Sequence, residues 1–307
     1  MGCHAGRTPA RRGAAASAIV RGLHRPQRAW FARMSSEPRR PALPASLAAI
    51  CAAVLAACTT PPAAPPLTLD RPVVLLGEVH DNAAQHALRL AAFEALLARG
   101  ARPALLMEQF DRDRQGAIDA YRARARTPDA DALIAAATGG AKSGWHWAFY
   151  RPFVALALQH GLPIVAANIG RTEARHIMND GLAAQGFDAA VPAEVLDGIA
   201  AEVQAGHCGL VDAPTARRMA LAQVARDQAM ARAVEAHADR GAVLLAGNGH
   251  VRTDLGVPRW LDPATRLRSE AIGLLEAGDP TAAYDRRVFT PAQARTDPCR
   301  GMQAPAR

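Results

Sequence analysis

Several features that define common protein classes are missing from this chain of 307 residues. No apolar run reaches the roughly 20 residues that a bilayer-spanning helix needs, which argues against a transmembrane segment. There is no internal repeat and no glycine-rich phosphate loop, and Gly77 to His80 lacks the spacing of a dinucleotide fingerprint. Lysine occurs once, at Lys142, beside abundant alanine and arginine, a composition that we attribute to codon usage.

The net charge of +8 is confined to the beginning of the chain. Residues 1–57 contain nine arginines and one glutamate, whereas the 250 residues that follow have 27 basic and 27 acidic side chains. The pI near 10.0 is therefore a property of this leader. It gives no reason to expect a nucleic-acid partner.

The leader has the layout of a secretory signal. The basic pair Arg39-Arg40 precedes an apolar run over 44–54, and small residues follow in Leu55-Ala56-Ala57-Cys58. A cysteine after Leu-Ala-Ala resembles a bacterial lipobox, in which Cys58 carries lipid and becomes the first mature residue. The alternative is a short transmembrane anchor, for which the run is too short. We infer a start at Met34, with residues 1–33 as a gene-model extension, although an unusually long leader remains the alternative.

The mature chain divides into a tether and one domain. Residues 58–69 are rich in proline and predict a tether between lipid and domain, and residues 70–307 are long enough for one sizeable core. Once Cys58 carries lipid, Cys208 and Cys299 are the two cysteines left in an oxidising compartment, so we predict that they form a disulfide. The alternative is two unconnected thiols.

The domain is predicted to be α/β, with a mostly parallel sheet flanked by helices on both faces. Short apolar runs alternate with helical patterns, which is typical of such sheets. The runs lie at 73–76, 104–107, 164–167 and 242–246. Asp81 or Asn82 is expected to cap the first helix and Gly100 to end it. The C-terminal residues 268–275 and 287–289 are expected to extend the sheet.

Two strands end in the same pattern, Gly-x-x-His. One is Gly77-Glu78-Val79-His80 and the other is Gly247-Asn248-Gly249-His250. The carboxyl ends of parallel strands gather at one edge, where ligands bind. The polar residues at or just past such ends are Glu78, His80, Glu108, Asn168, Arg171 and His250. Two imidazoles and two carboxylates suit a divalent metal or acid–base chemistry, and the alternative is that they merely end strands and cap helices.

Longer motifs resemble the ChaN family of haem-binding lipoproteins, associated with bacterial iron uptake. They are Leu76 to Asn82, Met107 to Phe110, Tyr150-Arg151-Pro152, Ala167-Asn168 and Gly247 to Pro258. The resemblance covers about residues 70–300. It implies a haem-binding α/β domain, tethered to a membrane, that handles haem iron outside the cytoplasm. The wider group includes the Tiki and TraB proteins and erythromycin esterases, which share paired Gly-x-x-His motifs.

With that resemblance, the aromatic segment Trp145 to Tyr150 becomes a candidate haem wall. A porphyrin needs apolar walls, an axial ligand and cations for its propionates. His146 and Tyr150 lie four residues apart, so one helical face would present both as ligands. The further cofactor-binding candidates are Asn168 and, for the propionates, Arg151, Arg171 and Arg252. The alternative for the aromatic segment is an ordinary core helix with a snorkelling tyrosine.

The rival function is a metal-dependent hydrolase of the Tiki, TraB or erythromycin esterase type. In that interpretation Glu78, His80, Glu108 and His250 hold a divalent metal that activates water. The aromatic segment favours haem, so we expect a binding protein rather than an enzyme. Two copies of the chain sandwiching haem, as a homodimer, and a membrane scaffold without ligand are left open.

Processing at Cys58 gives a first testable prediction. Thr59 rather than aspartate follows Cys58, so we expect an outer membrane lipoprotein whose domain faces the periplasm or the cell surface. Cys58→Ala should leave unlipidated protein that no longer fractionates with membranes. Membrane-bound protein that retains residues 1–57, detected by mass spectrometry, would contradict the prediction.

Overall fold

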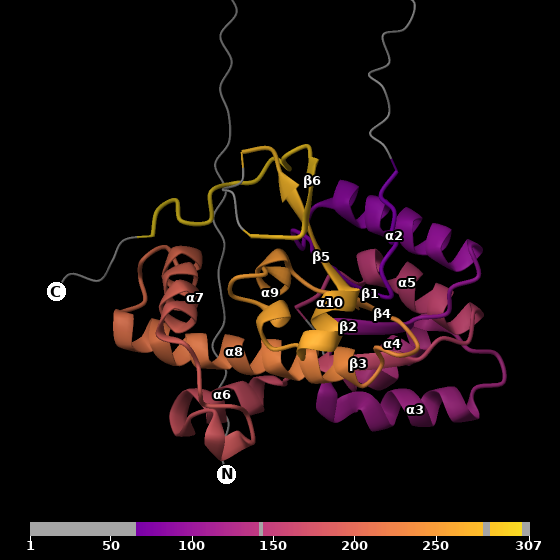
Figure 1. Ribbon diagram of the computed structural model, residues 1–307, viewed down its shortest axis with the longest axis horizontal. Helices are drawn as coiled ribbons and strands as arrows, with labels where there is room; N and C mark the ends of the chain where they lie inside the picture. The colour runs from indigo at the N-terminus through magenta and orange to yellow at the C-terminus, as the bar shows by residue number, and fades with distance from the viewer. Residues whose placement is uncertain (1–65, 141–143, 279–282, 303–307) are drawn as a thin grey trace, which may run out of the picture. The chain divides into compact units, whose positions relative to one another are not determined.

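The computed structural model describes residues 66–140, 144–278 and 283–302 (Figure 1). The predictions about the leader, the start at Met34 and the lipidation of Cys58 concern residues outside these ranges. At the start of the described part, Leu67 and Leu69 are buried in the hydrophobic core at 6% and 1% exposure. The packed domain therefore begins slightly before residue 70, within the last residues that we assigned to the tether.

A six-stranded sheet forms the centre of the domain, and all of its neighbouring strands are parallel. The strands are β1 (Val73–Leu76), β2 (Ala104–Asp111), β3 (Ile164–Asn168), β4 (Ala242–Leu245), β5 (Ser269–Glu276) and β6 (Arg286–Thr290). All four residues of β1 and of β4 are buried, as expected for strands covered on both faces. The predicted parallel α/β fold is confirmed, including the C-terminal extension by β5 and β6.

The helices surround this sheet. They are α2 (Ala83–Ala98), α3 (Gln115–Arg124), α4 (Ala130–Thr138), α5 (Trp147–Gln159), α6 (Arg171–Asp180), α7 (Ala193–Gly206), α8 (Ala213–Glu235), α9 (Asn248–Val251) and α10 (Pro263–Arg268). Three 3-10 turns are also described, η1 (Arg112–Arg114), η2 (Ala183–Gln185) and η3 (Val257–Arg259). Among the described residues, no helix is long and apolar enough to cross a membrane.

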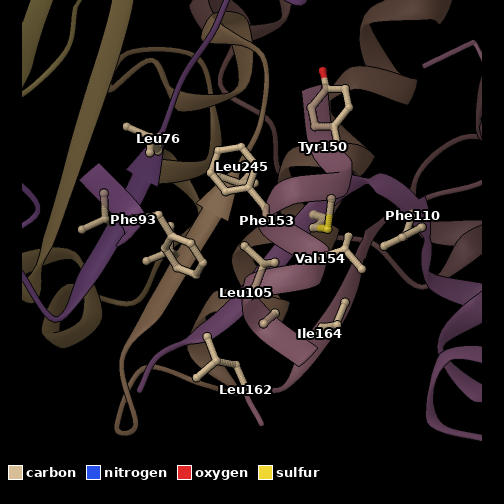
Figure 2. Packing of buried hydrophobic residues seen from close by; sticks show 14 of the residues in the cluster. Leu76, Phe93, Leu105, Phe110, Tyr150, Phe153, Val154, Leu162, Ile164 and Leu245 are labelled. Carbon is tan, nitrogen blue, oxygen red and sulfur yellow. The ribbon is translucent and has the colours of Figure 1, made fainter. Parts of the chain in front are cut away.

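Alternate residues of each strand point to opposite faces and so build two cores. Val74 and Leu76 of β1 join the core under α2, α4 and α5, whereas Val73 and Leu75 join the core under α8. Figure 2 shows Phe153 and Val154 of α5 within the first core. A third cluster, made by α6, α7 and α8, lies beyond the sheet. Helices therefore cover both faces, as predicted.

Local sequence explains where α2 begins and ends. The Asn82 side chain accepts a hydrogen bond of 3.1 Å from the backbone N–H of Gln85, so Asn82 is the N-cap. After the C-cap Arg99, Gly100 adopts a left-handed φ of +90°, which glycine tolerates without steric cost. Both features match the sequence prediction.

The order of the strands decides where the site lies. The sheet runs β3-β2-β4-β1-β5-β6, so the chain moves outward from β1 through β2 to β3 and then returns to insert β4 between β2 and β1. The carboxyl ends of β1, β4 and β2 are therefore neighbours at the centre of the sheet. This reversal is the position where parallel α/β sheets open a crevice for ligands.

Cys208 and Cys299 form a disulfide across 91 residues, with their Cα atoms 5.4 Å apart, which confirms the predicted pairing. Cys208 lies just after α7, in a turn with a positive φ of 58°. The bond ties the end of α7 to the C-terminal segment after β6.

The disulfide should stabilise the domain by lowering the conformational entropy of the unfolded chain. In the chain-entropy account, a loop of this length is worth about 4.6 kcal/mol. Urea denaturation of reduced protein, or of the Cys208→Ala/Cys299→Ala variant, should therefore show a free energy of unfolding lower by up to that amount. Mass spectrometry of non-reduced tryptic peptides checks the pairing in exported protein, and two freely alkylated thiols would contradict it.

Candidate functional site

The two Gly-x-x-His motifs meet at the centre of the sheet edge, and their glycines make the approach possible. A Cβ added at Gly247 would lie 2.8 Å from Cε1 of His80, and one at Gly77 would lie 2.3 Å from Oδ1 of Asn248. A side chain at position 77 would collide with Asn248, Val251 and the backbone of Ile272, so glycine is needed there, whereas a side chain at position 247 would displace the His80 ring. Glu78, His80, Glu108 and His250 are thereby brought together, as the sequence predicted.

Glu78 lies at the centre of a buried polar cluster. Its carboxylate is 2% exposed, forms an ion pair with the fully buried Arg89 of α2, and accepts a hydrogen bond from the Tyr150 hydroxyl. It also accepts from Nδ1 of His80 at 2.8 Å, and Nδ1 of His86 lies 3.4 Å from its second oxygen. Burial lowers the pKa of Arg89 to about 10, which leaves the guanidinium charged at neutral pH. The ion pair thus gives the buried Glu78 carboxylate a counter-charge.

His80 is the member of this cluster that reaches solvent, with its side chain 50% exposed. Because Nδ1 donates to the Glu78 carboxylate, Nε2 carries the lone pair that can accept a proton or bind a metal. The His80 ring packs edge-on against Trp145, with ring centroids 4.9 Å apart. The aromatic segment is therefore part of the site.

Tyr150 and His146 do not share a helical face. Helix α5 begins at Trp147, so His146 precedes it as the N-cap, and the spacing argument that placed both side chains on one face is wrong. His146 is exposed and packs on Phe149 with ring centroids 4.6 Å apart. Tyr150 is fully buried, and in Figure 2 its hydroxyl lies at the end of the ring that points away from the apolar cluster. The pKa of the Tyr150 hydroxyl is raised, and burial is the main cause.

A second polar cluster joins the ends of β2 and β4 to α8. Nδ1 of His250 lies 2.6 Å from Oδ1 of Asp227, and its Nε2 lies 3.6 Å from Oε1 of Glu108. The other Glu108 oxygen accepts from the backbone N–H of Gly247 at 2.8 Å. Burial raises the pKa of Asp227 to about 6. The two carboxylates outweigh the effect of burial on His250 and raise its pKa as well, so the protonated imidazolium is favoured.

A cavity of about 790 Å³ opens beside His80 at this edge. Phe110 and Trp145 provide aromatic wall, and Asn168 and Ile169 come from the end of β3. Charged side chains also line it: Asp111, Arg114, Arg171 and Arg226. Its volume is within the range of small-molecule and cofactor pockets.

The predicted propionate-binding arginines separate in space. Arg171 lines the cavity, whereas Arg151 forms a surface ion pair with Asp131 at 2.8 Å. Arg252 pairs with Asp254 and Glu202 and lines a smaller cavity of about 290 Å³ between α7 and α8. The predicted Asn168 lines the large cavity and donates to the backbone carbonyl of Glu108 at 2.9 Å.

Sequence reasoning missed Arg114, Arg226 and Asp227. Each lies in a helix or turn without a motif of its own, and only the fold brings it to the strand ends. Within residues 66–140, 144–278 and 283–302, no three histidine, cysteine, aspartate or glutamate side chains are grouped so that they could hold a metal ion.

Comparison with known proteins places the chain in a family. Residues 68–261 match the model of the haem-binding uptake family of the Tiki superfamily, ChaN. That match covers more than half of the chain, so the protein belongs to this superfamily. Within it, the protein is a member of the ChaN family, as its motifs predicted. No curated protein matches it.

A solved structure shows the same fold. A structure of ChaN of Campylobacter jejuni, described as binding haem cofacially, is 21% identical, with a TM-score of 0.56 over 69% of this chain and 84% of the other. A mutant of the erythromycin esterase EreC in its open conformation is 14% identical, with a TM-score of 0.38 over 67% and 70% of the two chains.

The buried ion pair gives a prediction about stability. Arg89→Met alone should lower the free energy of unfolding by about 3–5 kcal/mol, because it leaves the Glu78 charge buried without its partner. Glu78→Gln/Arg89→Met should recover much of that loss. Urea denaturation measures both.

Arg99→Met is the matched control for this experiment. Arg99 comes directly after the same helix, is exposed, and forms a long ion pair of 3.8 Å with Asp70. An exposed pair of this kind is worth less than about 1 kcal/mol. Equal losses in Arg89→Met and Arg99→Met would contradict the central role of the buried pair.

Proposed function

We propose that this protein binds haem in the cavity beside His80, as the ligand site of a lipoprotein that takes part in bacterial haem and iron acquisition. The observation that supports this most directly is the cavity itself. It has about 790 Å³ of space, aromatic walls and a half-exposed imidazole. Membership of the haem-binding uptake family supports the same ligand.

The residues that line the cavity suit a porphyrin. Phe110 and Trp145 offer apolar surface, and the Nε2 of His80 is the nitrogen that the Glu78 hydrogen bond leaves available. Nε of Arg226 is buried and has no hydrogen-bond partner among the described residues, so it is available to bind a propionate. Bound haem would supply an iron centre to be carried.

The geometry favours His80 as the axial ligand. Tyr150 and His146 stay predicted ligands. The Tyr150 oxygen, however, is buried and donates to Glu78, so ligation by tyrosinate requires that hydrogen bond to break and the raised pKa to be overcome. His80 needs neither change.

Lipid attachment at Cys58, location at the outer membrane and delivery of haem iron belong to the same proposal and rest on the signal-like leader. A second copy of the chain is proposed to complete the site. The cofacial haem described for ChaN of Campylobacter jejuni supports such an arrangement.

The hydrolase alternative has less support. Glu78, its candidate metal ligand, is already occupied by Arg89, Tyr150 and His80. His250 is held between Asp227 and Glu108. We therefore do not propose hydrolysis as a second function.

Hemin titration tests the proposal. The purified domain should give a saturable Soret shift, and His80→Ala should change the spectrum and weaken binding about tenfold or more. Because Tyr150 donates to the carboxylate that holds His80, Tyr150→Phe should change the spectrum slightly when His80 is the ligand. If tyrosinate is the ligand, ferric haem should be largely high-spin, and Tyr150→Phe should abolish that spectrum. His176→Ala is the control, since His176 is exposed and lies near a single carboxylate, Asp180.

Two results would overturn the proposal. One is a folded domain that shows no saturable titration with hemin. The other is purified protein with a stoichiometric divalent metal that Glu78→Ala or His250→Ala removes, because that is the behaviour expected of the hydrolase.

A further inference from the structure

Three arginines from separate parts of the chain line the cavity beside His80. Arg114 ends η1, Arg171 begins α6, and Arg226 lies in α8. Arg114 and Arg171 are exposed, whereas Arg226 is half-buried. The sheet edge thus gathers three positive charges that are 55 residues or more apart in sequence.

These guanidinium groups are not neutralised by the protein. In the described part of the chain, no carboxylate lies within 4.0 Å of any of the three, whereas Arg151 and Arg252 are both paired. Arg226 makes one long hydrogen bond of 3.4 Å to Oδ1 of Asn168, and its Nε is buried without a partner. Buried donors of this kind are nearly always satisfied in proteins, so the Nε of Arg226 is available to a ligand that brings an acceptor into the cavity.

The cavity also contains one carboxylate, Asp111, which lies against the start of α6. Its Oδ2 is 3.3 Å from the position that a Cβ on Gly170 would occupy, and no side chain caps α6. Burial raises the pKa of Asp111, while Arg226 and Arg114 oppose that shift. Even when Asp111 is ionised, three guanidinium groups face one carboxylate, and a positive excess remains.

The neighbouring walls indicate what kind of anion fits. Phe110 and Trp145 line the same cavity as the arginines, so the ligand has an apolar body as well as negative groups. Guanidinium groups bind carboxylates through paired N–H donors. We propose that Arg114, Arg171 and Arg226 form a carboxylate subsite that selects tetrapyrroles by their carboxylates, whether or not a metal is bound.

This inference rests on the proposed function, and it adds which chemical groups of the ligand the site recognises. A ligand held through its carboxylates binds as the metal-free porphyrin, and esterifying those carboxylates removes most of the affinity. Axial ligation predicts the reverse dependence, because it requires the metal and tolerates the ester.

Four ligands separate these contributions in equilibrium titrations of the purified full-length protein, followed by porphyrin absorbance or fluorescence under one buffer and detergent condition. They are hemin, protoporphyrin IX, and the dimethyl ester of each. We expect protoporphyrin IX to bind within about tenfold of hemin. We expect each dimethyl ester to bind at least about tenfold more weakly than its free acid, because charge-assisted hydrogen bonds are lost.

Variants then locate the subsite. Arg114→Gln and Arg171→Gln change exposed side chains, so the fold should survive, and each should weaken protoporphyrin IX binding about tenfold while leaving binding of its dimethyl ester unchanged. Arg226→Lys keeps the charge and should weaken binding less than Arg226→Gln. Arg151→Gln is the matched control, because Arg151 is exposed but paired with Asp131 outside the cavity. Circular dichroism melting curves confirm that each variant is folded.

The outcomes distinguish this inference from the proposed function. Three results would overturn the carboxylate subsite and leave haem binding intact. The first is equal affinity for free acid and ester, and the second is failure of protoporphyrin IX to bind where hemin binds. The third is that the Arg114→Gln and Arg171→Gln variants bind protoporphyrin IX as the Arg151→Gln variant does. If hemin itself does not bind, the proposed function fails and the subsite fails with it.

Discussion

The ion pair between Glu78 and Arg89 is the interaction on which the arrangement of the site depends. Both side chains are buried, and neither charge is tolerable in the interior without the other. The pair joins the end of β1 to α2, and the hydrogen bond from Tyr150 adds α5 to the same point. Three elements are thereby held in one position around a single carboxylate.

That carboxylate also determines the state of His80. Its hydrogen bond to Nδ1 fixes the tautomer and the ring orientation, so Nε2 is the ring nitrogen left available, on the side of the ring that lies against Gly247. Trp145 packs against the ring from the side. A half-exposed histidine at a strand end would otherwise be mobile; here it is held by groups that are buried behind it. The ion pair therefore acts on the ligand site from within the core.

The close contact between the two Gly-x-x-His motifs is the second constraint. Because β4 inserts between β2 and β1, the end of β4 lies directly beside His80, and a side chain at position 247 would displace the His80 ring. The same insertion places Glu108 against the N–H of Gly247 and next to His250. The repeated motif thus has a steric reason, independent of whether its polar residues carry out chemistry.

The sequence alone determined the parallel α/β class, the strands, the Cys208–Cys299 pairing and the strand-end residues, and it narrowed the cap of the first helix to Asp81 or Asn82. These follow from local patterns or, for the cysteines, from elimination. It wrongly put His146 and Tyr150 on one helical face. A spacing of four residues places two side chains on the same face only when both residues are inside the helix, and His146 precedes α5. It did not reveal Arg89, Arg114, Arg226 or Asp227, which lie on helices or turns where such residues usually face solvent. Only the tertiary structure decided that these charges meet at one edge, because strand order brings together segments that no local pattern connects.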